Sequence, residues 1–226
     1  MGRHVQIVLS NPASAERERE FNDWYDNRHV PDLMALPGFV GAQRFRVAVP
    51  LRGDVPWRYL ALYELEGDDL GRVLADLVDA HADGRIAVSD VLDGASLTAL
   101  VYSALGPLRG EIGRRRQLML ALSRPADGQE AAFNAWYDDI HVPEVTAIPG
   151  IPAGRRYRLA MPFLDPLARG RDYLALYDVD APDLPALAAE VGRRARDGRT
   201  RMSPAIDIEA LQAFFLEPVG PAVLKA

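Results

Sequence analysis

The chain contains the same segment twice, and this internal repeat limits the possible folds more than any other feature. Residues 21–31 read FNDWYDNRHVP and residues 133–143 read FNAWYDDIHVP. The segment YLALY at 59–63 returns at 173–177, in the same order along the chain. Ordered matches with small changes of offset indicate a duplicated module. We place the boundary within 106–113, which gives modules 1–108 and 109–226.

Both repeats predict the same succession of elements. Apolar residues at helical spacing predict helices over Ser14–His29, followed at Pro31 by a second short helix, and over Asp68–Ile86. The strands that we expect in the first module are His4–Ser10, which is mirrored by Gln117–Ser123, then Phe39–Val49, Trp57–Leu65 and Ser96–Ala104. The resulting β-α-β-β-α-β order is that of a ferredoxin-like unit.

The duplication also predicts how the modules combine. A ferredoxin-like unit has helices on one face of its antiparallel sheet, so the other face needs a cover. Two modules in one chain can supply that cover by packing sheet to sheet, as the single-chain form of an isologous dimer. We therefore expect an α+β protein built as a pseudo-two-fold α+β barrel, either a monomeric pseudo-dimer or a homodimer.

Composition excludes several classes of protein. Lys and Arg total 26 against 32 Asp and Glu, a net charge of −6, which argues against nucleic acid as a partner. The absence of cysteine excludes disulfides, thiolate metal sites and thiol nucleophiles. No apolar run approaches the roughly 18 residues of a membrane span, and the N-terminus lacks the apolar core of a secretory signal. We expect a cytoplasmic protein with no membrane partner.

The repeated pattern W-Y-x-x-x-H-x-P, followed by P-G and a strand, resembles the EthD-type branch of the dimeric α+β barrel superfamily. It occurs at 24–38 and again at 136–150. The superfamily includes cofactor-free quinone-forming monooxygenases, muconolactone isomerases, polyketide cyclases, decarboxylases and haem enzymes. The resemblance implies a small hydrophobic substrate, aromatic or polyketide-like. The tandem fusion departs from the usual pattern and leaves open whether both pockets work.

His29 and His141 occupy the same position in the two repeats and are the main catalytic candidates. Each is expected where the first helix ends, and a helix C-terminus raises the pKa of a histidine. Such a side chain can act as a general acid or base near neutral pH. The alternative is a structural role, in which the ring caps the last helical carbonyls and fixes the proline kink.

Two aromatic residues precede each histidine. Tyr25 and Tyr137 lie four residues before it, on the same helical face, and can orient the imidazole or bind a ligand oxygen. Trp24 and Trp136 are candidates for substrate contact. For all four side chains the alternative is packing in a small core.

Further candidates for substrate binding are charged or phenolic. Asp26 and Asp32 flank His29 by three residues and can orient its ring, although an Asp at position 32 also simply favours the start of a helix. Arg44 can hold an acidic group, or form a solvated or inter-module ion pair. Tyr63 is a candidate for pocket lining. The first half has more polar residues near its histidine (His4, Gln6, Asp23 and Arg28), which favours His29 over His141.

With one repeated histidine in each half, a dedicated metal site is not expected, and we expect no cofactor. The leading hypothesis is a cofactor-independent lyase, cyclase, isomerase or decarboxylase that uses a histidine as acid or base on a hydrophobic aromatic or polyketide-like carbonyl compound. The alternatives are a non-catalytic small-molecule-binding or accessory protein, a cofactor-free monooxygenase, and a haem enzyme with an axial histidine.

Overall fold

The computed structural model describes residues 2–164 and 170–225 of the chain. Its strands are β1 (Arg3–Ser10), β2 (Phe39–Arg52), β3 (Tyr59–Glu66), β4 (Thr98–Ala104), β5 (Arg109–Gly110), β6 (Gln117–Ser123), β7 (Ala153–Met161), β8 (Tyr173–Val179) and β9 (Gln212–Leu224). Its helices are α1 (Glu18–Trp24), α2 (Val30–Met34), α3 (Leu70–Ala82), α4 (Glu130–Trp136), α5 (Val142–Thr146) and α6 (Leu184–Arg196). Two π-helical turns, η1 (Tyr25–His29) and η2 (Tyr137–His141), join α1 to α2 and α4 to α5.

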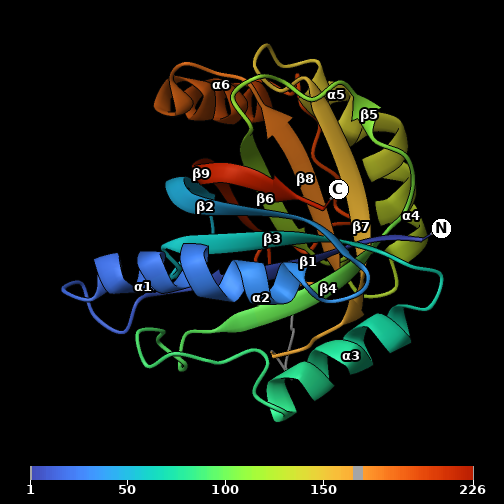
Figure 1. Cartoon of the computed structure of the whole chain (residues 1–226). Helices are drawn as coiled ribbons and strands as arrows, with labels where there is room; N and C mark the ends of the chain where they lie inside the picture. Colours follow the sequence, from blue (N-terminus) through green and yellow to red (C-terminus); the bar gives the residue numbers. More distant parts are fainter. Residues whose placement is uncertain (1, 165–169, 226) are drawn as a thin grey trace.

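The two modules close into one antiparallel barrel, as the repeat predicts (Figure 1). Within the modules the strand orders are β4-β1-β3-β2 and β9-β6-β8-β7, the order of a ferredoxin-like sheet. The barrel closes where β2 pairs with β9 and where β4 pairs with β7, so each seam joins one module to the other. The prediction of tandem ferredoxin-like modules in a pseudo-two-fold α+β barrel is confirmed.

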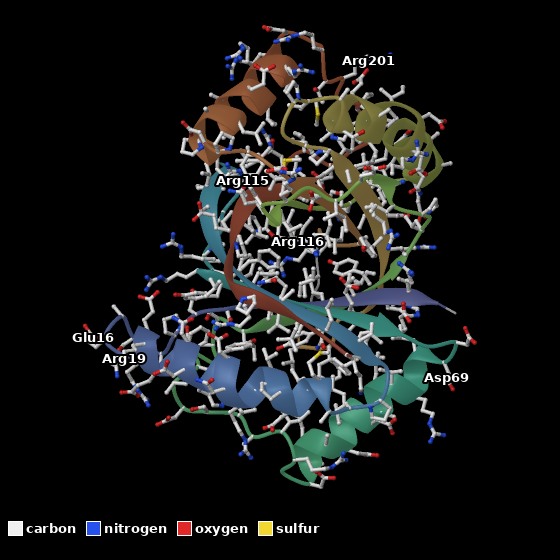
Figure 2. All side chains as sticks on the ribbon, turned by 45° about the horizontal axis from the view of Figure 1, so that its top comes forward. Glu16, Arg19, Asp69, Arg115, Arg116 and Arg201 are labelled. Carbon is white, nitrogen blue, oxygen red and sulfur yellow. The ribbon has the colours of Figure 1, made fainter. Side chains whose placement is uncertain are left out.

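The helices lie outside the barrel in two layers, α1, α2 and α3 over the first sheet and α4, α5 and α6 over the second (Figure 1). Inside the barrel, apolar side chains from both modules form a single core; Ile7, Leu60, Leu122 and Phe214 in it are fully buried. Two further cores fill the spaces between each helix layer and its sheet. Charged side chains such as Arg19 and Asp69 point outward (Figure 2).

The first helix differs from the prediction in a way that affects the site. It begins at Glu18, and it does not stop before Pro31 but continues through η1 into α2. In η1 the backbone N–H of Val30 donates to the carbonyl of Tyr25, five residues back. The wider turn places Pro31 in the first turn of α2 and accommodates a residue that has no backbone N–H. His29 therefore lies inside a continuous helical run.

Among the described residues, no helix combines the length and the apolar character that crossing a membrane requires.

Candidate functional site

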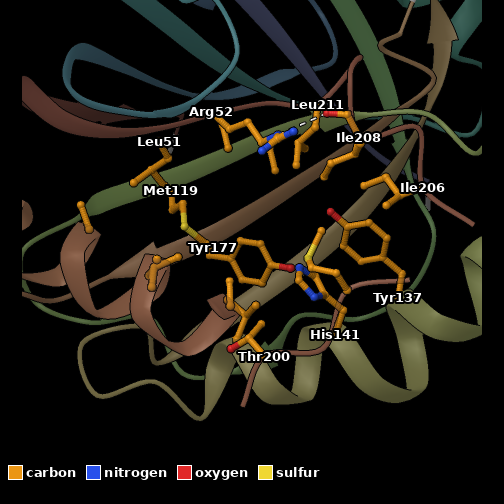
Figure 3. Close-up of a pocket in the computed structure, with 18 of the residues that line it drawn as sticks. Leu51, Arg52, Met119, Tyr137, His141, Tyr177, Thr200, Ile206, Ile208 and Leu211 are labelled. Atoms are coloured by element: carbon orange, nitrogen blue, oxygen red, sulfur yellow. Dashed lines mark hydrogen bonds between the residues drawn. The ribbon is translucent and has the colours of Figure 1, made fainter. Parts of the chain in front are cut away.

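Each module has one cavity of notable size between its helices and the outer face of its sheet. The cavity of the first module has a volume of about 320 Å³, and that of the second about 380 Å³. The first is lined by Gln6, Trp24, Tyr25, His29 and Leu164, among others. The second is lined by Met119, Tyr137, His141, Tyr177 and Arg52, among others (Figure 3). Both volumes fall in the range of small-molecule pockets.

The aromatic residues and the histidine of each repeat form the same cluster twice. The Trp24 and His29 rings stack with centroids 4.7 Å apart, and the Tyr25 ring meets His29 edge to face at 5.0 Å. In the second module the corresponding distances from the His141 ring are 4.5 Å to Trp136 and 5.1 Å to Tyr137. The Trp136 side chain is buried outside the cavity lining, and its Nε1 donates to the carbonyl of Arg201 at 3.0 Å.

Both histidines are partly buried, and each has a buried nitrogen without a hydrogen-bond partner. Nδ1 of His29 and Nδ1 of His141 have no hydrogen-bond partner. Burial, together with smaller contributions from His81 and Arg44, lowers the pKa of His29 to about 4. Burial also lowers the pKa of His141 to about 4, although the backbone of Arg201 opposes this shift. The prediction that a helix C-terminus raises the pKa of these histidines is wrong, because the helix continues past the ring and the surroundings are apolar. Both rings are uncharged at neutral pH.

The phenols beside the histidines keep their protons. Burial raises the pKa of Tyr25 to about 12, although the Arg44 guanidinium opposes the shift, and burial likewise raises the pKa of Tyr137. A protonated phenol can donate a hydrogen bond to a ligand oxygen. The tyrosine and the neutral imidazole of each cavity thus offer both a donor and an acceptor to a bound molecule.

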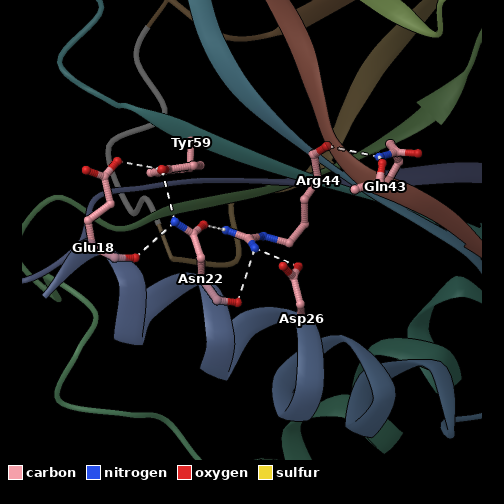
Figure 4. Close-up of polar contacts among 7 residues, drawn as sticks. Glu18, Asn22, Asp26, Gln43, Arg44 and Tyr59 are labelled. Carbon is pink, nitrogen blue, oxygen red and sulfur yellow. Dashed lines mark hydrogen bonds and ion pairs between the residues drawn. The ribbon is translucent and has the colours of Figure 1, made fainter.

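Arg44 is not among the residues that line the first cavity and belongs to a polar network between β2 and α1 (Figure 4). Its side chain is only 4% exposed; Nη1 donates to Asp26 at 2.6 Å and Nη2 to the side chain of Asn22 at 2.7 Å. The guanidinium also lies over the Tyr25 ring, 4.4 Å from its centroid. Arg156 repeats these contacts with Asp138 and Asn134. These arginines therefore hold the helix to the sheet within one module.

The other candidates are also outside the main cavities. Asp26 is paired with Arg44, and Asp32 with Arg28 at 2.8 Å, so neither carboxylate orients His29. Tyr63 is fully buried in the core between the first helix layer and its sheet and is not part of the first cavity's lining, whereas its equivalent Tyr177 lines the second cavity. A role of Asp26, Asp32, Arg44 or Tyr63 in substrate binding stays a prediction.

The preference for the first module loses its basis in the structure. Of the four polar residues expected around His29, only Gln6 lines its cavity. His4 hydrogen-bonds Ser103 at 2.8 Å, Asp23 faces Arg19 at 3.9 Å, and Arg28 binds Asp32. The repeat pattern shows which positions differ but not where their side chains point.

The second cavity is larger because the helix that lines it carries smaller side chains. Gly192 and Ala195 of α6 stand where α3 carries Val78 and His81. Sequence reasoning missed these positions and also Arg52, Arg196 and Thr200, which line the same cavity. The repeat contains a signal for these positions, because the equivalent residues of the other module are different: Leu164 for Arg52, Ala82 for Arg196 and Ile86 for Thr200. In the described part of the chain, no group of three or more acidic, histidine or cysteine side chains is placed to hold a metal ion.

No protein-family model and no curated protein matches this sequence. Solved structures do match its fold. A proposed monooxygenase from Fusobacterium nucleatum subsp. nucleatum superposes with a TM-score of 0.62 at 9% identity, over 100% of this chain and 95% of that one. An anthrone oxidase-like protein gives 0.57 at 14% identity, over 99% and 93%. A chlorite dismutase variant from Candidatus Nitrospira defluvii gives 0.53 at 10%, over 96% and 92%. The chain has the dimeric α+β barrel fold.

Proposed function

We propose that the chain is a cofactor-independent enzyme of the EthD type, working in the cytoplasm, that uses a neutral histidine to move a proton on a hydrophobic aromatic or polyketide-like carbonyl compound. The observation that carries the proposal is the unpaired Nδ1 of His29 and of His141, each on a ring that lines a mostly apolar cavity. A buried polar atom without a partner is costly to the fold. A ligand group that bonds to this nitrogen removes that cost.

The chemistry follows from the two side chains that meet at each cavity. The neutral imidazole accepts a proton from carbon next to a carbonyl, or from a phenol, and returns it at another position. The protonated Tyr25 or Tyr137 donates to the oxygen on which negative charge develops. Isomerisation, cyclisation and dehydration begin with this proton removal, and decarboxylation forms the same kind of enolate by loss of CO2 before carbon is protonated. The proposed class is therefore a lyase or an isomerase.

A second candidate is a cofactor-free monooxygenase. The structures of a proposed monooxygenase and of an anthrone oxidase-like protein share this fold, which supports that alternative at the level of architecture. Oxygenation of an electron-rich aromatic compound begins with the same proton removal, so His29 and His141 would have the same role. The two candidates differ in whether the product gains oxygen.

The test compares the wild type with His29→Gln, His141→Gln and the double variant, after circular dichroism has shown equal folding. Each protein is incubated with metabolite extract of the source organism, and mass spectrometry follows compounds consumed and formed. His4→Gln is the matched control, because His4 lies outside both histidine cavities. We expect conversion to fall about a hundredfold or more in the double variant, the usual contribution of a general acid–base. Unchanged conversion in the double variant would remove the histidines as catalysts, whereas no conversion by the wild type would favour a binding protein.

A further inference from the structure

The two cavities occupy equivalent places but differ in charge. Arg52 and Arg196 line the second cavity, whereas the first has Leu164 in place of Arg52, and none of its described lining residues is Lys, Arg, Asp or Glu. No Asp or Glu is among the described lining residues of the second cavity either. Among the described lining residues, arginine thus gives the second cavity two positive charges that have no counterpart in the first.

The arginines lie where a ligand can reach them. The Arg52 side chain, from the β2 end in the other module, is 47% exposed; its Nε donates to the carbonyl of Ile208 at 3.2 Å, and Nη2 is 3.9 Å from the highly exposed carboxylate of Glu209 (Figure 3). The exposed Arg196 packs over α6 beside Gly192; its Nη1 is 3.3 Å from where a Cβ on that glycine would lie. Glycine at this position leaves room for the guanidinium at the mouth.

The second cavity also has unpaired polar atoms at depth. Oγ1 of Thr200, the hydroxyl of Tyr177 and Nδ1 of His141 are buried atoms that have no hydrogen-bond partner. All three residues line this one cavity (Figure 3). The residue equivalent to Thr200 in the first module is Ile86, which offers no hydrogen bond. The cavity is thus polar at one side, apolar along its walls and cationic at its mouth.

We propose that the second cavity selects a hydrophobic ligand that bears a carboxylate, held by Arg52 and Arg196, while the first cavity takes an uncharged hydrophobic ligand. Guanidinium groups bind carboxylates by paired, charge-assisted hydrogen bonds. The chain has a net charge of −6, so a local cationic mouth concentrates anions that the rest of the surface repels. This proposal rests on the proposed function, since it gives the substrate class on which His141 acts.

The test measures binding of two probes of similar shape, 2-naphthoate and 2-naphthol, to the full chain by titration calorimetry at pH 7. We expect 2-naphthoate to bind at one site about tenfold more tightly than 2-naphthol, a difference of about 1.4 kcal/mol. This preference should shrink as salt is added. In Arg52→Leu/Arg196→Ala the preference should disappear while 2-naphthol still binds. Both arginines are exposed. Arg196→Ala alone breaks no hydrogen bond that Arg196 is seen to make. This single variant should halve the logarithm of the preference for 2-naphthoate.

Two matched variants locate the site. Gly192→Leu places a side chain in the second cavity where only the flexible Arg196 tip stands close, and should remove the 2-naphthoate site. Leu164→Arg adds the missing charge to the first cavity and should create a second 2-naphthoate site. Equal affinity for the two probes, no binding of 2-naphthoate, or a preference that survives the double arginine variant would each overturn the proposal. Binding is measured without turnover, so charge selection with unchanged conversion in the histidine variants would overturn the proposed function alone.

Discussion

Between pH 7.5 and pH 4.5, the free energy of unfolding of the wild type should fall by about 5 kcal/mol more than that of a variant in which His29 and His141 are both replaced by glutamine. Burial holds the pKa of each folded histidine at about 4, against about 6.5 in an unfolded chain. In this window the unfolded chain binds the proton first. The stability that the neutral rings contribute is therefore fully present above pH 6.5 and is lost as the pH falls toward 4.

The measurement is urea unfolding of the wild type, both single variants and the double variant at the two pH values. All other titrating groups are shared, so the difference in pH dependence isolates the two rings. Each single variant should recover about half of the effect, because the two sites lie in separate modules and should add. A double variant whose stability falls with acid as steeply as that of the wild type would contradict the assignment of buried, neutral histidines.

Phe214→Ala should lower the free energy of unfolding by about 3–5 kcal/mol, the usual cost of truncating a fully buried phenylalanine. Phe214 lies on β9 inside the barrel, with none of its surface exposed, in the core to which both modules contribute. Its loss leaves a hole that the closed barrel cannot collapse to fill. The effect should be a single cooperative transition at lower denaturant, because the shared core couples the modules.

Chemical denaturation followed by tryptophan fluorescence measures this effect. Leu224→Ala is the matched control, because Leu224 lies on the same strand but is 70% exposed, and its change should stay within about 0.5 kcal/mol. Two separate transitions in the wild type, with only one of them shifted by Phe214→Ala, would show that the modules fold independently.

The architecture could be predicted from the sequence because the duplication determines both the order of elements in each half and the way in which the two halves pack. The repeated FN-x-WYD motif and the returning YLALY strand set the same element order in both halves, and a sheet with one uncovered face requires a second sheet. Strand pairing across both seams then follows from the pseudo-two-fold relation between the modules. The module boundary at 108/109 stays a prediction.

The chemistry of the histidines could not be predicted in the same way. Hydrophobic spacing does not distinguish a helix that ends before Pro31 from one that passes it through a π-helical turn. That distinction decides whether the ring meets a helix C-terminus or an apolar core, and so decides the direction of the pKa shift. The alternation along β2 likewise placed Arg44 and Phe45 on opposite faces without saying that Arg44 would be paired with Asp26 on the helix.

The sequence contains the differences between the two cavities, but they can be recognised only when the fold shows which residues line each cavity. Thr200 against Ile86, and Arg52 against Leu164, are mismatches between equivalent positions. They lie far from the W-Y-x-x-x-H-x-P motif along the chain, and Arg52 reaches the second cavity from the first module. Only the closure of the barrel brings the end of β2, with Arg52, next to the helices of the other module.

The most direct test of proton transfer by the repeated histidines is the uptake of solvent deuterium into the compound that the wild-type chain converts. The reaction is run in D2O, and mass spectrometry measures deuterium at carbon in the product and in the recovered substrate. We predict incorporation by the wild type and by His4→Gln, and a loss of about a hundredfold or more in the His29→Gln/His141→Gln variant. Incorporation by that double variant at the wild-type rate would contradict a role for either histidine in the chemistry.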